Sequence, residues 1–121
     1  MNKSHATIYL TRYIGESDGE WTEDEMLIAF KAGHLASAAK EAPDWADRIV
    51  SGELNFRSSI FILNQESREV QMNCLVTCLL TALADGYMDS AESEALATIT
   101  VNLNKNITAT DVIEAVKKRL S

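Results

Sequence analysis

MNCLVTCLLTALADGYMDSAESE, residues 72–94, joins a strongly apolar segment to an acidic turn. Its leucines recur at helical offsets, and its two cysteines widen the apolar surface until little polar circumference is left beyond Thr77 and Thr81. A helix that is apolar on nearly all sides is normally buried. We therefore expect this helix at the centre of the fold.

The acidic turn predicts a second helix directly after the first. Gly86 can adopt the positive φ that ends a helix. Asp89 and Glu92 have the spacing of a capping box, in which the first side chain caps a helix and the second returns a hydrogen bond to the cap. We expect helix, tight turn and helix, with the rest of the chain packed around them.

Helical spacing predicts further helices along the chain. They are expected over residues 5–16, 23–40, 43–51 and 55–63, from the Asp89 cap to Leu103, and after a cap at Thr108. Alternation leaves a strand open for residues 8–12, whereas the alternation in residues 97–104 is outweighed by the strong cap before it. The sequence thus predicts an all-α fold, a single-domain helical bundle of about seven helices over residues 1–121.

Several residues are expected at defined places in these helices. Thr22 and Glu25 form another capping box. Pro43 suits the first position of its helix, and Gly52 ends that helix. The residues expected on the inner faces are Met26, Leu27, Phe30, Leu35, Ala38, Trp45, Ile49, Val112, Ile113, Val116 and Leu120.

Composition and charge narrow the functional classes. The chain has 121 residues, of which 46% are hydrophobic, and this suffices for one core. The formal charge of -7 disfavours a nucleic-acid partner, and the cations at residues 117–119 are explained by the dipole of the last helix. No apolar run reaches the roughly 18 residues of a membrane span, and the first residues lack a signal-peptide pattern. We expect a soluble cytoplasmic protein.

The two cysteines, Cys74 and Cys78, lie one turn apart on the central helix. A disulfide between them would constrain almost nothing, and a metal site would need further ligands, whereas His5 and His34 are each single and distant in sequence. We expect buried, reduced thiols.

An acidic pattern occurs twice. SDGEWTEDE, residues 17–25, aligns with ADGYMDSAE, residues 84–92. The shared positions are Asp18, Gly19, Trp21, Thr22 and Glu25 in the first copy and Asp85, Gly86, Met88, Asp89 and Glu92 in the second. Turn and cap geometry explains each residue type. The repeat predicts two related helix-turn-helix halves around a common core.

A calcium site is an alternative to simple capping. In an EF-hand alignment, Asp85, Asp89 and Glu92 fit the fifth, ninth and twelfth positions, but Thr81 and Leu83 stand where the first and third ligands belong. A standard high-affinity site is therefore disfavoured. A weak divalent-cation site at these carboxylates, or at Asp18, Glu23 and Glu25, stays open beside the capping interpretation.

The paired patterns SDGEWTEDE and ADGYMDSAESE resemble the TerB-like family of tellurite-resistance proteins, whose fold is shared with the N-terminal domain of DnaJ-like membrane co-chaperones. The resemblance implies an all-helical bundle of two related halves and a role in stress response or scaffolding without an established catalytic activity. It also implies metal ligands in the acidic turns, which by position are Asp18, Glu25, Asp85, Asp89 and Glu92. Two departures are a first helix with less alanine and Thr22 in place of an acidic residue.

Nucleotide-binding and hydrolase motifs are absent from the sequence. Our leading hypothesis is a non-enzymatic TerB-like protein that binds a protein partner, with a divalent cation as its only candidate cofactor. The alternative is a small acidic immunity or inhibitor protein that neutralises a basic toxin, as size and charge suggest. An enzyme that uses His34 and carboxylates is the weakest hypothesis.

Overall fold

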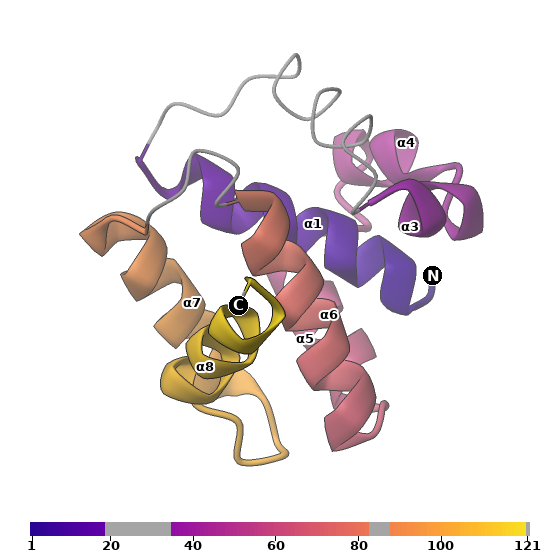
Figure 1. Ribbon diagram of the computed structural model, residues 1–121. Coiled ribbons are helices and arrows are strands. Elements are labelled where there is room, and N and C mark those ends of the chain that lie inside the picture. Colours follow the sequence, from indigo (N-terminus) through magenta and orange to yellow (C-terminus); the bar gives the residue numbers. More distant parts are fainter. Residues whose placement is uncertain (19–34, 83–87, 121) are drawn as a thin grey trace.

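The computed structural model describes residues 1–18, 35–82 and 88–120, and these are all-α (Figure 1). The elements are α1 (Lys3–Gly15), η1 (Glu16–Asp18), α3 (Ala36–Glu41), α4 (Trp45–Val50), α5 (Phe56–Asn64), α6 (Arg68–Ala82), α7 (Ser90–Asn102) and α8 (Ala109–Leu120). No strand occurs in these ranges, so the all-α prediction is confirmed. The alternating segment 8–12 lies in α1, and residues 97–102 of the other alternating segment lie in α7, which ends at Asn102.

Two helices rather than one form the centre of the bundle. Leu75 and Leu79 of α6 are fully buried, as predicted, but so are Ile8, Leu10 and Ile14 of α1. Helix α1 packs against α3, α4, α5, α6 and α7. Figure 1 shows α3 and α4 near its N-terminal end and α7 on the other side of the molecule. Helix α6 therefore has the central place that was predicted for it, and α1 shares that place.

The burial of α1 depends on polar residues that satisfy their own hydrogen bonds. The hydroxyl of Thr7 donates to the carbonyl oxygen of Lys3 at 2.8 Å, and that of Thr11 donates to the carbonyl oxygen of Thr7 at 2.7 Å. A hydroxyl bonded within its helix can enter the core without leaving an unpaired donor. The stripe of apolar residues alone therefore underestimated how much of α1 is buried.

The capping box predicted at α7 and the cap predicted at Thr108 of α8 are present. The backbone N–H of Glu92 donates to Asp89 Oδ1 at 2.8 Å, and the backbone N–H of Asp89 donates to Glu92 Oε1 at 3.2 Å. Thr108 caps α8 and accepts from the backbone N–H of Asp111 at 3.1 Å. Asn55 caps α5 in the same way. Side-chain acceptors therefore fix where these helices begin.

The region around α3 and α4 departs from the prediction in part. Helix α4 begins at Trp45 rather than at Pro43, since Asp44 is its N-cap residue. Gly52 follows it with a φ of 84°, in the left-handed region, as expected of a helix stop. Trp45 and Ile49 are only half-buried, because α4 covers the bundle from outside.

Other inner-face predictions had mixed outcomes. In the predicted 23–40 helix, Leu35 is buried and Ala38 half-buried, while Met26, Leu27, Phe30 and the Thr22–Glu25 cap lie outside the described residues. In α8, Val112 and Val116 are buried and Ile113 is half-buried. Leu120 is 73% exposed, so its expected place on the inner face was wrong. It is the last residue of α8 and lies beyond the part of the helix that packs on the core.

Candidate functional site

The structure describes part of each acidic repeat. In the first copy, Asp18 ends η1, and its side chain lies outside the described residues, as do Glu25 in the same copy and Asp85 in the second. Asp89 and Glu92 are described and form the capping box of α7. Because η1 packs against α7, two segments distant in sequence lie side by side.

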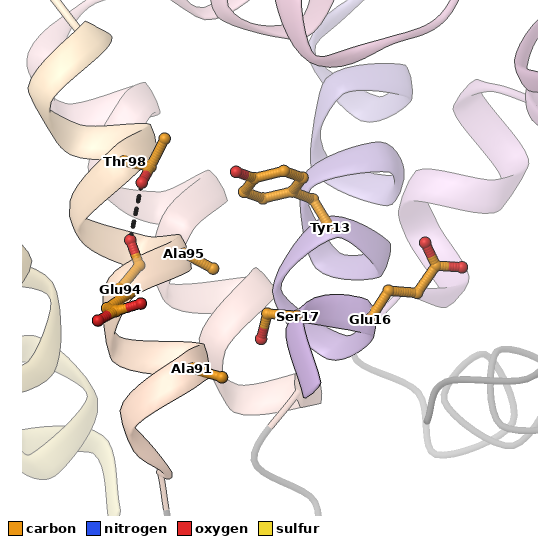
Figure 2. A pocket seen from close by; sticks show the side chains of 7 residues that line it. All are labelled: Tyr13, Glu16, Ser17, Ala91, Glu94, Ala95 and Thr98. Carbon is orange, nitrogen blue, oxygen red and sulfur yellow. Dashed lines mark hydrogen bonds between the residues drawn. The ribbon is translucent and has the colours of Figure 1, made fainter. Parts of the chain in front are cut away.

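A groove opens between α1–η1 and α7, beside both repeat segments (Figure 2). It has a volume of about 420 Å³ and is lined by Tyr13, Glu16, Ser17, Ala91, Glu94, Ala95 and Thr98. Ser17 directly precedes Asp18, and Ala91 lies between Asp89 and Glu92. The groove is thus where the structure brings the described parts of the two repeats together.

One wall of the groove carries an aromatic ring. Figure 2 shows Tyr13 and Ser17 directed from α1 and η1 towards α7, whereas Glu16 extends away from it. The ring of Tyr13 packs on Phe56 of α5, with 4.9 Å between the ring centroids. The hydroxyl of Ser17 donates to the carbonyl oxygen of Ile14 at 2.6 Å. These contacts hold the wall in place without a ligand.

The opposite wall is formed by one face of α7. Ala91 and Ala95 have small side chains and leave room for a ligand. Glu94 and Thr98 are exposed, and the hydroxyl of Thr98 donates to the backbone carbonyl oxygen of Glu94 at 2.9 Å (Figure 2). The Glu94 carboxylate is therefore not used in that hydrogen bond.

The charges around the groove are acidic. Glu16 is paired with Arg12, whose Nε lies 2.7 Å from Glu16 Oε1. The Glu94 carboxylate has no ion-pair partner within residues 1–18, 35–82 and 88–120. No Lys, Arg or His is among the described residues that line the groove. The lining of the groove therefore includes the Glu94 carboxylate, which is not neutralised by a described residue and which Figure 2 shows turned away from Tyr13.

The predicted cation ligands do not form a cage in the described part of the chain. Asp89 and Glu92 each use a carboxylate oxygen to accept a backbone N–H. No group of three or more His, Cys, Asp or Glu side chains that could hold a metal occurs in the described ranges. A calcium site takes six to eight oxygen ligands, so these two carboxylates alone do not fit one. A weak cation site that includes Asp18, Glu25 or Asp85 stays a prediction.

A polar cluster that sequence reasoning missed joins α1 to α4. His5 is buried, and its Nε2 lies 2.6 Å from Asp44 Oδ1. The backbone N–H of Asn2 donates to His5 Nδ1 at 3.1 Å, so Nε2 carries the hydrogen that bonds Asp44. Both ring nitrogens are occupied. This arrangement suits a structural histidine better than a general base.

The other oxygen of Asp44 accepts from Arg48. Arg48 Nε lies 2.8 Å from Asp44 Oδ2, and the same guanidinium also pairs with Glu53. The hydrogen bonds from Arg48 and then from His5 lower the pKa of Asp44 to about 2. The spacing of Asn2 and His5, which form a capping box, was the available signal in the sequence. This spacing did not reveal that Asp44 is the hydrogen-bond partner of His5.

The cysteines are free and buried, as predicted. Cys78 donates to the backbone carbonyl oxygen of Thr7 at 3.3 Å, and burial raises the pKa of its thiol to about 12. Cys74 lines a second groove, of about 240 Å³, between α1, α3 and α6. Burial also raises the pKa of the Cys74 thiol. Neither thiol has the lowered pKa of a reactive cysteine.

None of the protein-family models, curated proteins or solved structures compared with this chain gives a significant match. The TerB-like resemblance therefore stays a prediction from the two acidic patterns. The relation between two halves also stays a prediction, since Gly19 and Gly86 lie outside the described residues. Among the helices that are described, none combines the length and apolarity needed to cross a bilayer.

Proposed function

We propose that this protein is a non-enzymatic, TerB-like binding protein that holds a partner protein in the groove between α1–η1 and α7. The observation that carries the proposal is the position of this groove. Ser17 of one repeat and Ala91 of the other both line it, although the two repeats are far apart in sequence. A sequence pattern that occurs twice, with both copies beside one groove, suggests that the two copies share a role in recognition.

The chemistry of the described residues supports binding rather than catalysis. A catalytic site usually pairs a nucleophile with a base that is itself oriented by a third group. His5 is engaged through both nitrogens, and the two cysteines have raised pKa values. Among the described residues that line it, the groove offers hydroxyls, one aromatic ring and carboxylates.

A divalent cation at the acidic turns is an accessory part of the proposal. Binding at Asp89 or Glu92 would compete with the cap hydrogen bonds of α7, so we expect only weak affinity, in the millimolar range. Titration with calcium, magnesium and zinc, followed by amide shifts of Asp89 and Glu92, tests this part. Unchanged shifts would remove the cation while leaving the partner groove intact.

A second candidate function is the neutralisation of a basic toxin by a small acidic immunity protein. The net charge of -7 and the absence of basic side chains among the described groove-lining residues favour it. Both candidates use the same surface and differ in the partner. A stress or tellurite-resistance protein as partner supports the first, and a nuclease or other basic toxin supports the second.

Photo-crosslinking from single positions tests the groove as the binding site. A photoreactive side chain at Thr98, which is exposed and lines the groove, should capture a discrete partner in the native host. The matched control is the same side chain at Thr110, an exposed threonine on α8 outside the groove. Equal capture from both positions would contradict the proposal.

A further inference from the structure

Helices α3 and α4 cover one end of α1 without entering the core. Neither of them buries a side chain completely, whereas α1, α5, α6, α7 and α8 all do. For each of the two, the most extensive contact with another described helix is the one with α1. Each has six residues, fewer than the roughly 12 that an isolated helix needs in water. Their stability therefore depends on the contact with α1.

The apolar part of that contact is small. Ala42, which lies between α3 and α4, is fully buried in one cluster with Ile8 of α1, and Ala38 and Trp45 pack against it. This cluster is separate from the main core, to which α1, α5, α6, α7 and α8 contribute. A segment with few buried apolar contacts opens at a lower free energy than the core of the same protein.

The polar part of the contact lies at one corner. Asn2 Nδ2 donates to the carbonyl oxygen of Glu41 at 3.0 Å, and the hydroxyl of Ser4 donates to Glu41 Oε2 at 2.7 Å. His5 Nε2 lies 2.6 Å from Asp44 Oδ1. These contacts join the start of α1 to the turn between α3 and α4. They can therefore break together while the main core stays intact.

A groove rather than a packed interface separates α3 from α6. The groove of about 240 Å³ has Ser37, Ala38 and Glu41 of α3 on its lining, together with Thr7 of α1 and Cys74 of α6. Movement of α3 would remove one side of this groove. The Cys74 side chain, which is buried, would then face solvent.

We propose that residues 36–50 form a lid that opens from α1 as one unit while the core of α1, α5, α6, α7 and α8 stays folded, and that this opening uncovers Cys74. Figure 1 shows α3 and α4 near the N-terminal end of α1 and α7 on the other side of the molecule. The lid is therefore distinct from the α1–α7 groove, and the proposal does not depend on the proposed function.

Opening of the lid changes the chemistry of Cys74. In the closed structure, burial raises the pKa of the Cys74 thiol, and the Glu41 carboxylate of the lid acts in the same direction. Lys3 of α1 acts against them and stays in place when the lid opens. A thiol that is exposed beside a cation has a lower pKa and reacts faster with alkylating reagents. The lid therefore controls the reactivity of this cysteine.

Native-state hydrogen exchange of the whole chain tests the opening unit. The backbone N–H groups of Ala39, Ala42 and Arg48 report on the lid, since each donates to the carbonyl oxygen four residues earlier. Their protection factors should agree within about threefold and should be at least about a hundredfold lower than those of the central amides of α6. Urea below the unfolding transition should speed exchange in α6 and leave these three amides nearly unchanged, because opening of the lid exposes little surface.

Two variants separate the lid from the core. Asp44→Ala removes the acceptor of His5 and Arg48 and should speed exchange of the lid amides by about threefold to tenfold. Leu79→Ala weakens the core, which is folded whether the lid is closed or open. It should speed exchange in α6 by more than about thirtyfold and leave the lid amides within about twofold of wild type. The exposed Asp47→Asn on α4 is the matched control and should change neither rate.

The thiol gives an independent measurement. With Cys78→Ala as background, Asp44→Ala should speed alkylation of Cys74 by about threefold to tenfold, while Asp47→Asn should leave the rate within about twofold. Alkylation of Cys74 that Asp44→Ala does not change would overturn the proposal. So would lid amides that differ widely from one another, or lid amides that follow those of α6 in urea or in Leu79→Ala, since the lid would then open only by fraying or by global unfolding.

Discussion

His5 Nε2 lies 2.6 Å from Asp44 Oδ1, a contact that ties the first turn of α1 to the start of α4. Asp44 also accepts from Arg48, so one carboxylate joins two helices and supports its own helix. Helix α4 buries none of its side chains completely. Polar contacts therefore carry much of its attachment to the bundle.

This attachment predicts a dependence of stability on pH. The pKa of Asp44 falls from its usual 3.8 to about 2 because Arg48 and His5 donate to it. A depressed carboxyl pKa stabilises the folded protein above the unfolded-state pKa, and this contribution is lost as the pH falls to about 2. We expect the urea-unfolding midpoint of the Asp44→Asn variant to depend less on pH over this range.

The control for Asp44 is Asp47→Asn on the same helix. Asp47 is exposed, and its side chain has no ion pair among the described residues. Its replacement should leave the pH dependence as in the wild type. If Asp44→Asn kept the full loss of stability between pH 4 and 2, the role assigned to the contacts of Asp44 with Arg48 and His5 would be wrong.

Leu79 is fully buried at the centre of α6 and tests the core. Replacement by alanine should leave a cavity and lower the free energy of unfolding by about 2 to 5 kcal/mol. Val101→Ala on α7 is the comparison, since Val101 is 79% exposed and should change stability by less than about 0.5 kcal/mol. Equal urea midpoints for the two variants would show that α6 is not central.

The Asp89 cap predicts a smaller loss. Asp89→Ala removes the acceptor of the Glu92 backbone N–H and should cost about 0.5 to 2 kcal/mol of stability. Asp89→Asn keeps an acceptor oxygen and should cost less. Thermal or urea unfolding distinguishes the two. A loss as large with asparagine as with alanine would indicate that the negative charge of Asp89, rather than its cap hydrogen bond, stabilises this turn.

The two thiols should differ in access. Cys78 is fully buried and its thiol pKa is about 12, whereas Cys74 lines the 240 Å³ groove. With Cys74→Ala, alkylation of Cys78 at pH 8 should follow only global unfolding. With Cys78→Ala, alkylation of Cys74 should be at least about tenfold faster under native conditions. Mass spectrometry gives both rates, and equal rates would contradict the burial described for α6.

The sequence could predict the features that depend only on residues close together in the chain. Helical spacing, the glycine stop at Gly52 and the caps at Asp89 and Thr108 are set by residues within a few positions of one another, and all were predicted. The burial of α1 was not, because Thr7 and Thr11 hide their polar groups within their own helix.

The sequence also could not predict contacts between residues that are distant in the chain. Gln71 is buried in α6, and its Nε2 donates to Asn104 Oδ1 at 3.3 Å. Asn64 and Asn104, which lie far apart in the chain, are joined by a hydrogen bond of 2.9 Å. The groove depends on the same kind of placement, since no sequence pattern marks Tyr13 and Ala95 as residues that line one groove.

The central claim is that the α1–α7 groove binds the partner. Calorimetric titration of the partner captured at Thr98 against wild type, Glu94→Lys and Glu114→Lys tests it most directly. Both variants reverse one exposed carboxylate, but only Glu94 lines the groove. We predict that Glu94→Lys weakens binding at least about tenfold while Glu114→Lys stays within about twofold of wild type. Equal affinities for the two variants would contradict the account.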